Sequence, residues 1–234
     1  MKKFVPIILL IVVLLLAACG SGSTNSADQG SAAEPQEDAA TTEQEAATDA
    51  AEDDVVMTLG TVEGDVYENE TLGLGCKLTG WTFASSEDLA AENEWAANLV
   101  GDELREQLEK SDTFMDMFAE YSDDDSYMNV NVNVENMTLI ANALLDEQDY
   151  VDAAYPEMAD ALQQAGFDNV QVEKATVNLA GDDHPGMIIT SEYQGIQVFQ
   201  KQVCVKCGQY MVSITASVYN TDRTDDILSL FYKI

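Results

Sequence analysis

The chain has 234 residues, of which 10 are Lys or Arg and 43 are Asp or Glu, so its formal net charge at pH 7 is −33. A surface this acidic repels phosphate backbones and anionic headgroups, which excludes nucleic acid as a partner and disfavours electrostatic binding to a membrane surface. Any attachment to a membrane must therefore come through a lipid.

Residues 1–18 have the pattern of an export signal peptide. A Lys pair at positions 2 and 3 is followed by an apolar run over 4–16 and then by small residues. At about 1.5 Å per residue this run is too short to cross a hydrocarbon core of roughly 30 Å. The sequence Leu-Ala-Ala-Cys that ends at Cys19 resembles a bacterial lipobox. This resemblance implies cleavage before Cys19, lipidation of its thiol and a mature protein that begins there.

The lipid on Cys19 would place the protein on the extracytoplasmic face of a membrane. Two acyl chains, at about 0.8 kcal/mol per buried methylene, hold a protein stably where one does not. Gly20 follows Cys19, so the Asp that retains lipoproteins at an inner membrane is missing. We therefore expect the outer membrane in a two-membrane bacterium and the outward face of the cell membrane in a single-membrane one.

Residues 19–54 are predicted to be a disordered acidic tether. They are small, polar or acidic, with one Pro and no aromatic residue, and such a composition cannot bury enough apolar surface to fold. A flexible chain of this length has a root-mean-square span of roughly 30 to 35 Å. The tether would hold the rest of the chain away from the headgroups.

Residues 55–234 are expected to form one domain, which is large enough to fold without disulfides or a metal. Strands are predicted over 55–59 and 72–78. Ser85, with Asp88 three residues later, resembles a capping box that starts a helix. Apolar residues then recur every fourth position from 96 to 108, with Gly101 as a candidate break between two helices.

In the middle of the domain the spacing of apolar residues changes from a helical to a strand period. Phe114, Met117, Phe118 and Tyr121 have the spacing of a short helical face, whereas residues 127–135 alternate Val with Asn as a strand does.

Another helix is predicted from the apolar stripe that runs from Tyr150 to Ala165, with Gly166 as its C-terminal stop. Pro156 falls within its apolar stripe, so either the helix is kinked there or it begins at Pro156.

The last third is predicted to be an antiparallel meander of four strands, over 170–179, 186–193, 196–205 and 210–218. A closing helix is expected from Thr224 to Ile234. Because strands and helices occur in separate blocks, the predicted class is α+β, an antiparallel sheet meander flanked by helices.

One stretch resembles the opening of PsbP-like domains: Tyr67-x-Asn69-x-x-Leu72-Gly73, followed by Gly80-Trp81. The family includes a photosystem extrinsic subunit, a Ran-binding nuclear import factor and bacterial lipoproteins. The resemblance implies an antiparallel sheet between layers of helices, an α/β/α sandwich, and a role in binding or assembly. It brings no catalytic residues.

Three cysteines remain besides Cys19, namely Cys76, Cys204 and Cys207. One disulfide with one free thiol and three free thiols are both open. Cys204 and Cys207, three residues apart, could form half of a zinc site or a redox pair. However, a second Cys-x-x-Cys is missing and no helix follows to lower a thiol pKa. The alternative is that Cys204 is buried in the core and Cys207 is exposed in the turn, with no shared function.

His184 is the single histidine, so a hydrolytic triad would depend on it alone. Ser191 and Ser213 are the candidate nucleophiles, but neither lies in a Gly-x-Ser-x-Gly turn. The acidic run at 123–125, with Glu120, lacks the Gly and the closing Glu of a calcium loop. We therefore predict no metal site and no cofactor.

Asn129, Asn131 and Asn133 would share one face of their strand at about 6.6 Å spacing, which suits a groove for a small polar ligand. The alternative is the solvent-facing side of an edge strand.

The function expected from the sequence is a membrane-anchored surface lipoprotein whose domain is a non-enzymatic binding or assembly module. Its partners would be the membrane, through Cys19, and a protein or a small polar ligand. The alternatives are a thiol-disulfide enzyme using Cys204 and Cys207, a hydrolase using His184, and an envelope spacer.

Overall fold

The computed structural model describes residues 57–96, 99–123, 126–137 and 145–234. The expected signal peptide, Cys19 and the tether lie outside these ranges. The described part of the chain forms two antiparallel sheets and four helices, which confirms the predicted α+β class. None of the helices within these ranges is long and apolar enough to span a membrane.

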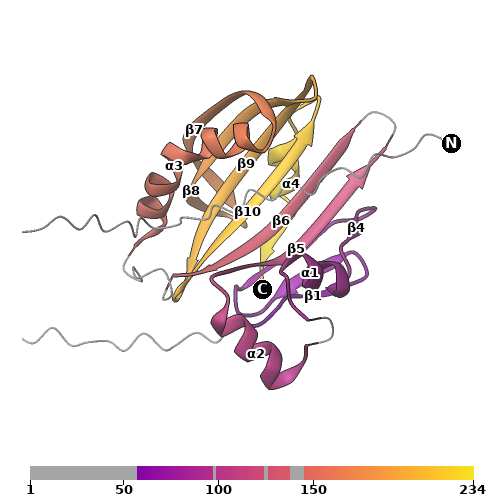
Figure 1. Cartoon of the computed structure of the whole chain (residues 1–234). Helices are drawn as coiled ribbons and strands as arrows, with labels where there is room; N and C mark the ends of the chain where they lie inside the picture. Colours follow the sequence, from indigo (N-terminus) through magenta and orange to yellow (C-terminus); the bar gives the residue numbers. More distant parts are fainter. Residues whose placement is uncertain (1–56, 97–98, 124–125, 138–144) are drawn as a thin grey trace, which may run out of the picture.

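The large sheet has seven strands: β4 (Thr82–Phe83), β5 (Thr113–Ser122), β6 (Tyr127–Asn136), β7 (Phe167–Leu179), β8 (Asp182–Tyr193), β9 (Ile196–Cys207) and β10 (Tyr210–Tyr219). Their order in space is β4-β5-β6-β10-β9-β8-β7 (Figure 1). The four strands of the last third lie side by side, so the predicted meander is confirmed. Gly181 and Gly195 turn the chain between them with φ of 94° and 79°, which glycine adopts without strain.

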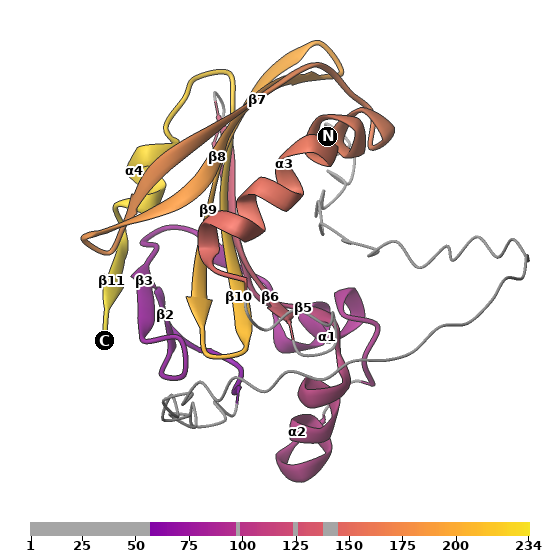
Figure 2. The same ribbon diagram turned by 90° about the vertical axis from the view of Figure 1, so that its left-hand side faces the viewer.

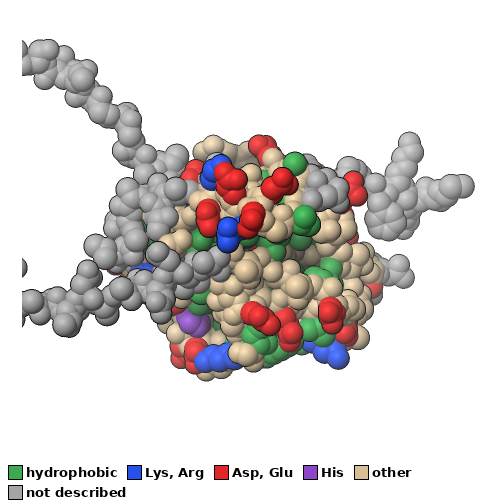
Figure 3. Space-filling view, turned by 90° about the horizontal axis from the view of Figure 1, so that it is seen from below, with side chains coloured by type: hydrophobic (Ala, Val, Ile, Leu, Met, Phe, Trp, Pro, Cys, Tyr) green, Lys and Arg blue, Asp and Glu red, His purple; other side chains and the backbone are tan. Residues whose placement is uncertain are grey.

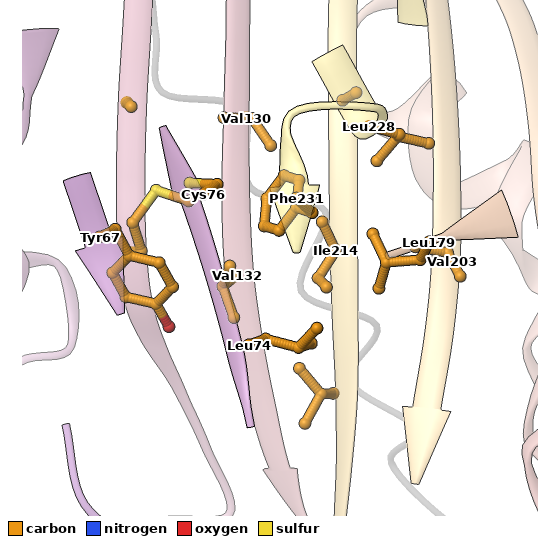
Figure 4. Close-up of a cluster of buried hydrophobic side chains, with 14 of the residues drawn as sticks. Tyr67, Leu74, Cys76, Val130, Val132, Leu179, Val203, Ile214, Leu228 and Phe231 are labelled. Carbon is orange, nitrogen blue, oxygen red and sulfur yellow. The ribbon is translucent and has the colours of Figure 1, made fainter. Parts of the chain in front are cut away.

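The small sheet packs against one face of the large one. Its strands are β1 (Thr61–Glu63), β2 (Val66–Asn69), β3 (Leu74–Lys77) and β11 (Phe231–Lys233), in the order β1-β2-β3-β11. Figure 2 shows β2, β3 and β11 as a separate layer beside the large sheet. Figure 4 shows the core between the layers, where Tyr67, Leu74 and Cys76 lie among Val and Ile side chains of the large sheet.

The opposite face of the large sheet is covered by α3 (Glu147–Gln164), as Figure 2 shows. The helix begins after Asp146, whose side chain accepts a hydrogen bond from the Asp149 N–H, and it stops before Gly166. Pro156 lies inside the helix, so the alternative in which the helix begins at Pro156 is wrong. Its buried side chains form a second core with the sheet: Tyr150, Val151, Ala154, Met158 and Leu162.

Three shorter helices complete the fold: α1 (Ser86–Glu92), α2 (Gly101–Lys110) and α4 (Thr224–Leu228). Ser85 and Asp88 form the predicted capping box at the start of α1. Gly101 begins α2, so the predicted break between two helices is confirmed. Helices therefore flank both faces of the large sheet, since α4 packs into the core on the small-sheet side.

Three local predictions are wrong. Residues 57–59 of the expected first strand are not in a strand. Phe231 lies in β11, where it pairs with Cys76, because the closing helix ends at Leu228. The apolar run from Phe114 to Tyr121 is strand β5 and not a helix. Almost all of its residues are buried, and a strand with both faces covered loses the alternation that distinguishes it from a helix.

Candidate functional site

The Asn residues of β6 lie in the middle of the large sheet. Because β6 is paired with β5 on one side and β10 on the other, the alternative of a solvent-facing edge strand is wrong. Asn131 is only 6% exposed, while Asn129 and Asn133 are half-buried. The polar face that the sequence predicted is therefore largely covered.

Polar residues continue across two neighbouring strands on the same face. Asn131 is registered with Thr215, and Thr215 with Gln202. The next row on one side joins Asn129, Ser217 and Gln200, and the row on the other side joins Asn133 with Ser213. Hydrogen bonds connect the side chains, from Gln202 Nε2 to Thr215 Oγ1 at 3.4 Å and from Asn133 Nδ2 to Asn131 Oδ1 at 2.7 Å. We call this surface the polar floor; it consists of Asn129, Asn131, Asn133, Gln200, Gln202, Ser213, Thr215 and Ser217.

A small cavity of about 20 Å³ lies between the polar floor and α3, which contributes Met158 and Leu162 to its walls. That volume accommodates roughly one water-sized species and no organic molecule. The groove for a small polar ligand that we expected at Asn129, Asn131 and Asn133 is thus closed to an organic ligand by the helix.

The structure does not bring the two candidate thiols together. Cys204 faces α3 and lies 3.8 Å from Ser213 Oγ, whereas Cys207 packs toward the core on the small-sheet side. Residues three apart on a strand point to opposite faces, which prevents them from sharing an ion or a disulfide. All three described cysteines are free thiols, and burial raises the pKa of Cys204 to about 12.

His184 belongs to β8 and holds the start of α3. Its Nδ1 lies 3.0 Å and 3.2 Å from the two carboxylate oxygens of Glu147, and Glu147 also accepts the Lys206 N–H at 2.9 Å. Within the described ranges, neither Ser191 nor Ser213 forms a hydrogen bond with His184. The arrangement connects a helix to the sheet and does not resemble a triad.

The described acidic residues of the 120–125 region are engaged locally. Glu120 accepts from the Tyr127 hydroxyl at 3.1 Å, and Asp123 accepts from the Ser126 N–H at 2.8 Å. The other two members of the acidic run, at positions 124 and 125, lie outside the described residues. Nowhere in the described ranges do three His, Cys, Asp or Glu residues gather as metal ligands.

A buried carboxylate that we did not predict lies between the two sheets. Asp116 stands at a bulge in β5, where the register with β6 shifts between Met115 and Met117. The extra residue of a bulge redirects a side chain, and Asp116 points toward the small sheet. The sequence signal was a single Asp within an otherwise apolar run, Phe114 to Ala119.

Asp116 accepts three hydrogen bonds, from the Gly60 N–H at 2.8 Å, the Tyr67 hydroxyl at 2.5 Å and Asn69 Nδ2 at 2.8 Å. Asn69 Oδ1 also accepts the Leu72 N–H at 3.0 Å. Two residues of the Tyr67-x-Asn69-x-x-Leu72 pattern thus bind this carboxyl group directly, and the third binds the Asn69 side chain. Burial raises the pKa of Asp116, and the three hydrogen bonds oppose that shift.

Gly60 is required at this position. A Cβ placed there would lie 2.2 Å from the Tyr67 ring and 3.1 Å from Asp116 Oδ2. Any side chain would therefore displace the tyrosine from the carboxyl group.

Asp116 also forms part of the wall of a pocket of about 380 Å³ between α1, α2 and β5. The volume lies within the range of small-molecule sites. Apolar side chains dominate the walls, and Figure 3, which views this end of the molecule, shows apolar and acidic side chains side by side on its surface. The lining residues are Leu59, Gly60, Ser86, Glu87, Leu89, Ala90, Asn93, Trp95, Ala96, Leu99, Val100, Leu104, Met115 and Asp116.

A scan against models of protein families finds no match, and a search of curated proteins finds none. Among solved structures, the chain is similar to LpqN, which is involved in cell envelope biogenesis of Mycobacterium tuberculosis. The two chains are 10% identical, and the match covers 52% of this chain and 78% of that chain with a TM-score of 0.34. A similarity this weak says nothing about what this chain binds, and the lipobox and the PsbP-like family stay predictions.

Proposed function

We propose that the protein is a membrane-anchored surface lipoprotein whose domain is a non-enzymatic module that binds an apolar small molecule. The observation that carries this proposal is the pocket of about 380 Å³ between α1, α2 and β5, with Asp116 in its wall. The anchor would be the lipid on Cys19, and the tether of residues 19–54 would hold the domain off the membrane surface.

The lining of the pocket supports a binding role. Leu89 of α1, Leu104 of α2 and Leu99 between the two helices offer apolar contact, and Trp95 provides a flat aromatic surface. Burial of apolar ligand surface would supply most of the affinity, at roughly 25 cal/mol per Å² before the costs of association are subtracted. A few polar groups in an apolar pocket orient a ligand, and Asp116 and Glu87 have the positions to do so.

The proposal can be tested with the full-length chain in lipid nanodiscs and a photoreactive probe, decanol that carries a diazirine. We expect crosslinks to concentrate on peptides from α1, α2 and β5, as read by mass spectrometry. Ala90→Phe would fill the pocket from α1 and should lower this labelling several-fold.

Ala153→Phe is the matched control, because Ala153 is exposed on α3 away from the pocket. It should leave the labelling of α1, α2 and β5 unchanged. Equal labelling of all three proteins, or crosslinks spread evenly over the domain, would contradict binding in this pocket.

A further inference from the structure

Three side-chain oxygens around the small cavity under α3 have no hydrogen-bond donor within the described part of the chain. They are Asn133 Oδ1, Gln200 Oε1 and Gln202 Oε1. Gln200 and Gln202 are 6% and 5% exposed, so bulk water does not serve their oxygens. Leaving a buried acceptor unpaired costs free energy because the atom has lost its water partner, and three such atoms around one cavity point to an occupant.

The amide orientations in the structure turn the oxygens of these three side chains away from their hydrogen-bonded neighbours. Each amide nitrogen already donates to a neighbour: Gln200 Nε2 to Ser217 Oγ at 3.1 Å, Gln202 Nε2 to Thr215 Oγ1 at 3.4 Å, and Asn133 Nδ2 to Asn131 Oδ1. Turning the Asn133 amide over would place its oxygen against the Asn131 oxygen, a contact between two acceptors. The hydroxyls of Ser217 and Thr215 can donate or accept, so they fit the orientation that the structure gives to the two Gln amides. In this orientation the carbonyl oxygens are the buried atoms without a partner, and all three residues line the cavity.

The size of the cavity limits what can satisfy them. At about 20 Å³ it has room for roughly one water-sized species. One water molecule has two protons to donate, so it would leave at least one of the three carbonyl oxygens without a partner. A small cation has no such limit of two protons, and carbonyl groups satisfy their oxygens in this way when they replace the hydration shell of an ion.

We propose that this cavity is a binding site for a small monovalent cation, of the class of Na⁺, K⁺ or NH₄⁺. Its ligands would be the side-chain oxygens of Asn133, Gln200 and Gln202, and Asn131 and Thr215 also line the cavity. The five residues are neutral and no carboxylate lines the cavity, which favours a single positive charge, since a divalent ion is much harder to desolvate without an anionic ligand.

The surroundings suit such an ion. The net charge of −33 raises the concentration of cations near the protein. Met158, Leu162 and Ile189 close the remaining walls with apolar groups, which keep further water away from the coordinated ion. The site is independent of the apolar pocket, because the two share no lining residue.

The first test follows thermal unfolding of the full-length chain in detergent micelles, at constant ionic strength, in choline chloride and with NaCl, KCl or NH₄Cl replacing it. We expect one or more of the small cations to raise the unfolding midpoint in a saturable way, whereas choline is too large to enter. The cation that shifts the midpoint at the lowest concentration identifies the occupant among the three.

Gln202→Leu removes one ligand while keeping a side chain of similar size. It should raise the half-saturating cation concentration by about ten-fold or more, since even outer-shell changes have effects of that order. Gln197→Leu is the matched control, because Gln197 lies exposed on the same strand, and it should keep the wild-type cation response.

Gln202→Glu provides a variant with a gain of function. A carboxylate at this position should strengthen cation binding, so the half-saturating concentration should fall, provided that a cation occupies the site. Crystals grown with Rb⁺ or Tl⁺ should show an anomalous peak between the polar floor and α3. Unfolding midpoints that are equal in all four salts, with a water-only peak in the cavity, would overturn the proposal.

Discussion

The Tyr67 hydroxyl donates a 2.5 Å hydrogen bond to Asp116 Oδ2, and this bond joins β2 of the small sheet to β5 of the large sheet. A similar hydrogen bond lies on the other side of the large sheet, where the Tyr150 hydroxyl of α3 donates to Glu135 of β6. Each outer layer is therefore fixed to the central sheet by a tyrosine and a buried carboxyl group.

Removing either member of the first pair should destabilise the domain by different amounts. Asp116→Ala leaves the donors of Gly60, Tyr67 and Asn69 without their acceptor, and we expect the free energy of unfolding to fall by about 3–5 kcal/mol. Tyr67→Phe removes one of three donors and should lower it by about 1–2 kcal/mol. Urea unfolding followed by tryptophan fluorescence measures both.

The control for this pair is Tyr232→Phe. The Tyr232 hydroxyl also donates to a carboxylate of the small sheet, Glu68 at 2.8 Å, but that pair is exposed. We expect a change below about 0.5 kcal/mol, since exposed polar pairs contribute little. Equal effects of Tyr67→Phe and Tyr232→Phe would show that the buried bond has no special part in joining the sheets.

Stability should increase as the solution becomes moderately acidic. Burial raises the pKa of both Asp116 and Glu135 in the folded protein. A carboxyl group with a raised folded pKa contributes stability that is present below its unfolded pKa of roughly 4 and is lost as pH rises through the folded value. Lowering the pH from 7 toward about 4.5 should therefore raise the free energy of unfolding.

Some exposed carboxylates have lowered pKa values in the folded protein, so they reduce stability when the solution becomes strongly acidic. Hydrogen bonds to Thr79, Lys174 and Lys233 lower the pKa values of Asp65, Asp152 and Asp182, in that order. Their contribution is lost only as pH falls below the ordinary carboxyl value.

Urea titrations from about pH 2.5 to about pH 8 should thus show a maximum near the ordinary carboxyl pKa of roughly 4, and Asp116→Asn should flatten the slope above it. A steady loss of stability from pH 7 downward would contradict this assignment.

The three thiols of the domain should differ in reactivity. Cys76 and Cys204 are fully buried, and burial raises the pKa of each to about 12, whereas Cys207 is half-buried and donates to the Thr71 carbonyl at 3.2 Å. Iodoacetamide at pH 8 should modify Cys207 first in the native full-length chain, and the other two only after unfolding.

Samples taken at successive times and analysed by peptide mass spectrometry give the rate of iodoacetamide modification at each cysteine. A Cys207→Ser variant should remove the fast phase without exposing the other two thiols. Modification of Cys204 at the same rate as Cys207 would argue against the placement of Cys204 beneath α3.

Lipidation depends on Cys19 alone. Cells that express the full-length chain and are fed an alkyne analogue of palmitate should label the wild-type protein and not a Cys19→Ser variant, and the variant should move from the membrane to the soluble fraction or stay uncleaved. Cys207→Ser serves as the control and should be labelled like wild type. Labelling that survives Cys19→Ser would exclude the lipobox as the attachment site.

Local pattern was enough to predict the class and most elements of the fold. The meander of β7 to β10 follows from alternation and glycine turns, and the start of α1 follows from Ser85 and Asp88, because turns and caps depend on residues close in sequence. The same local rules were wrong for β5. A strand buried on both sides has no polar face, so its spacing could be read as helical.

The sequence by itself determined the α+β class and the acidic composition, and it predicted the anchor at Cys19, since composition and short motifs carry that information. Only the tertiary structure decided that the Asn face of β6 is covered by α3, that Cys204 and Cys207 face opposite sides, and that Asp116 meets Tyr67. These relationships join segments far apart in the chain, and burial of an Asn or Asp depends on what packs above it. That information arises from long-range packing, which no window of neighbouring residues contains.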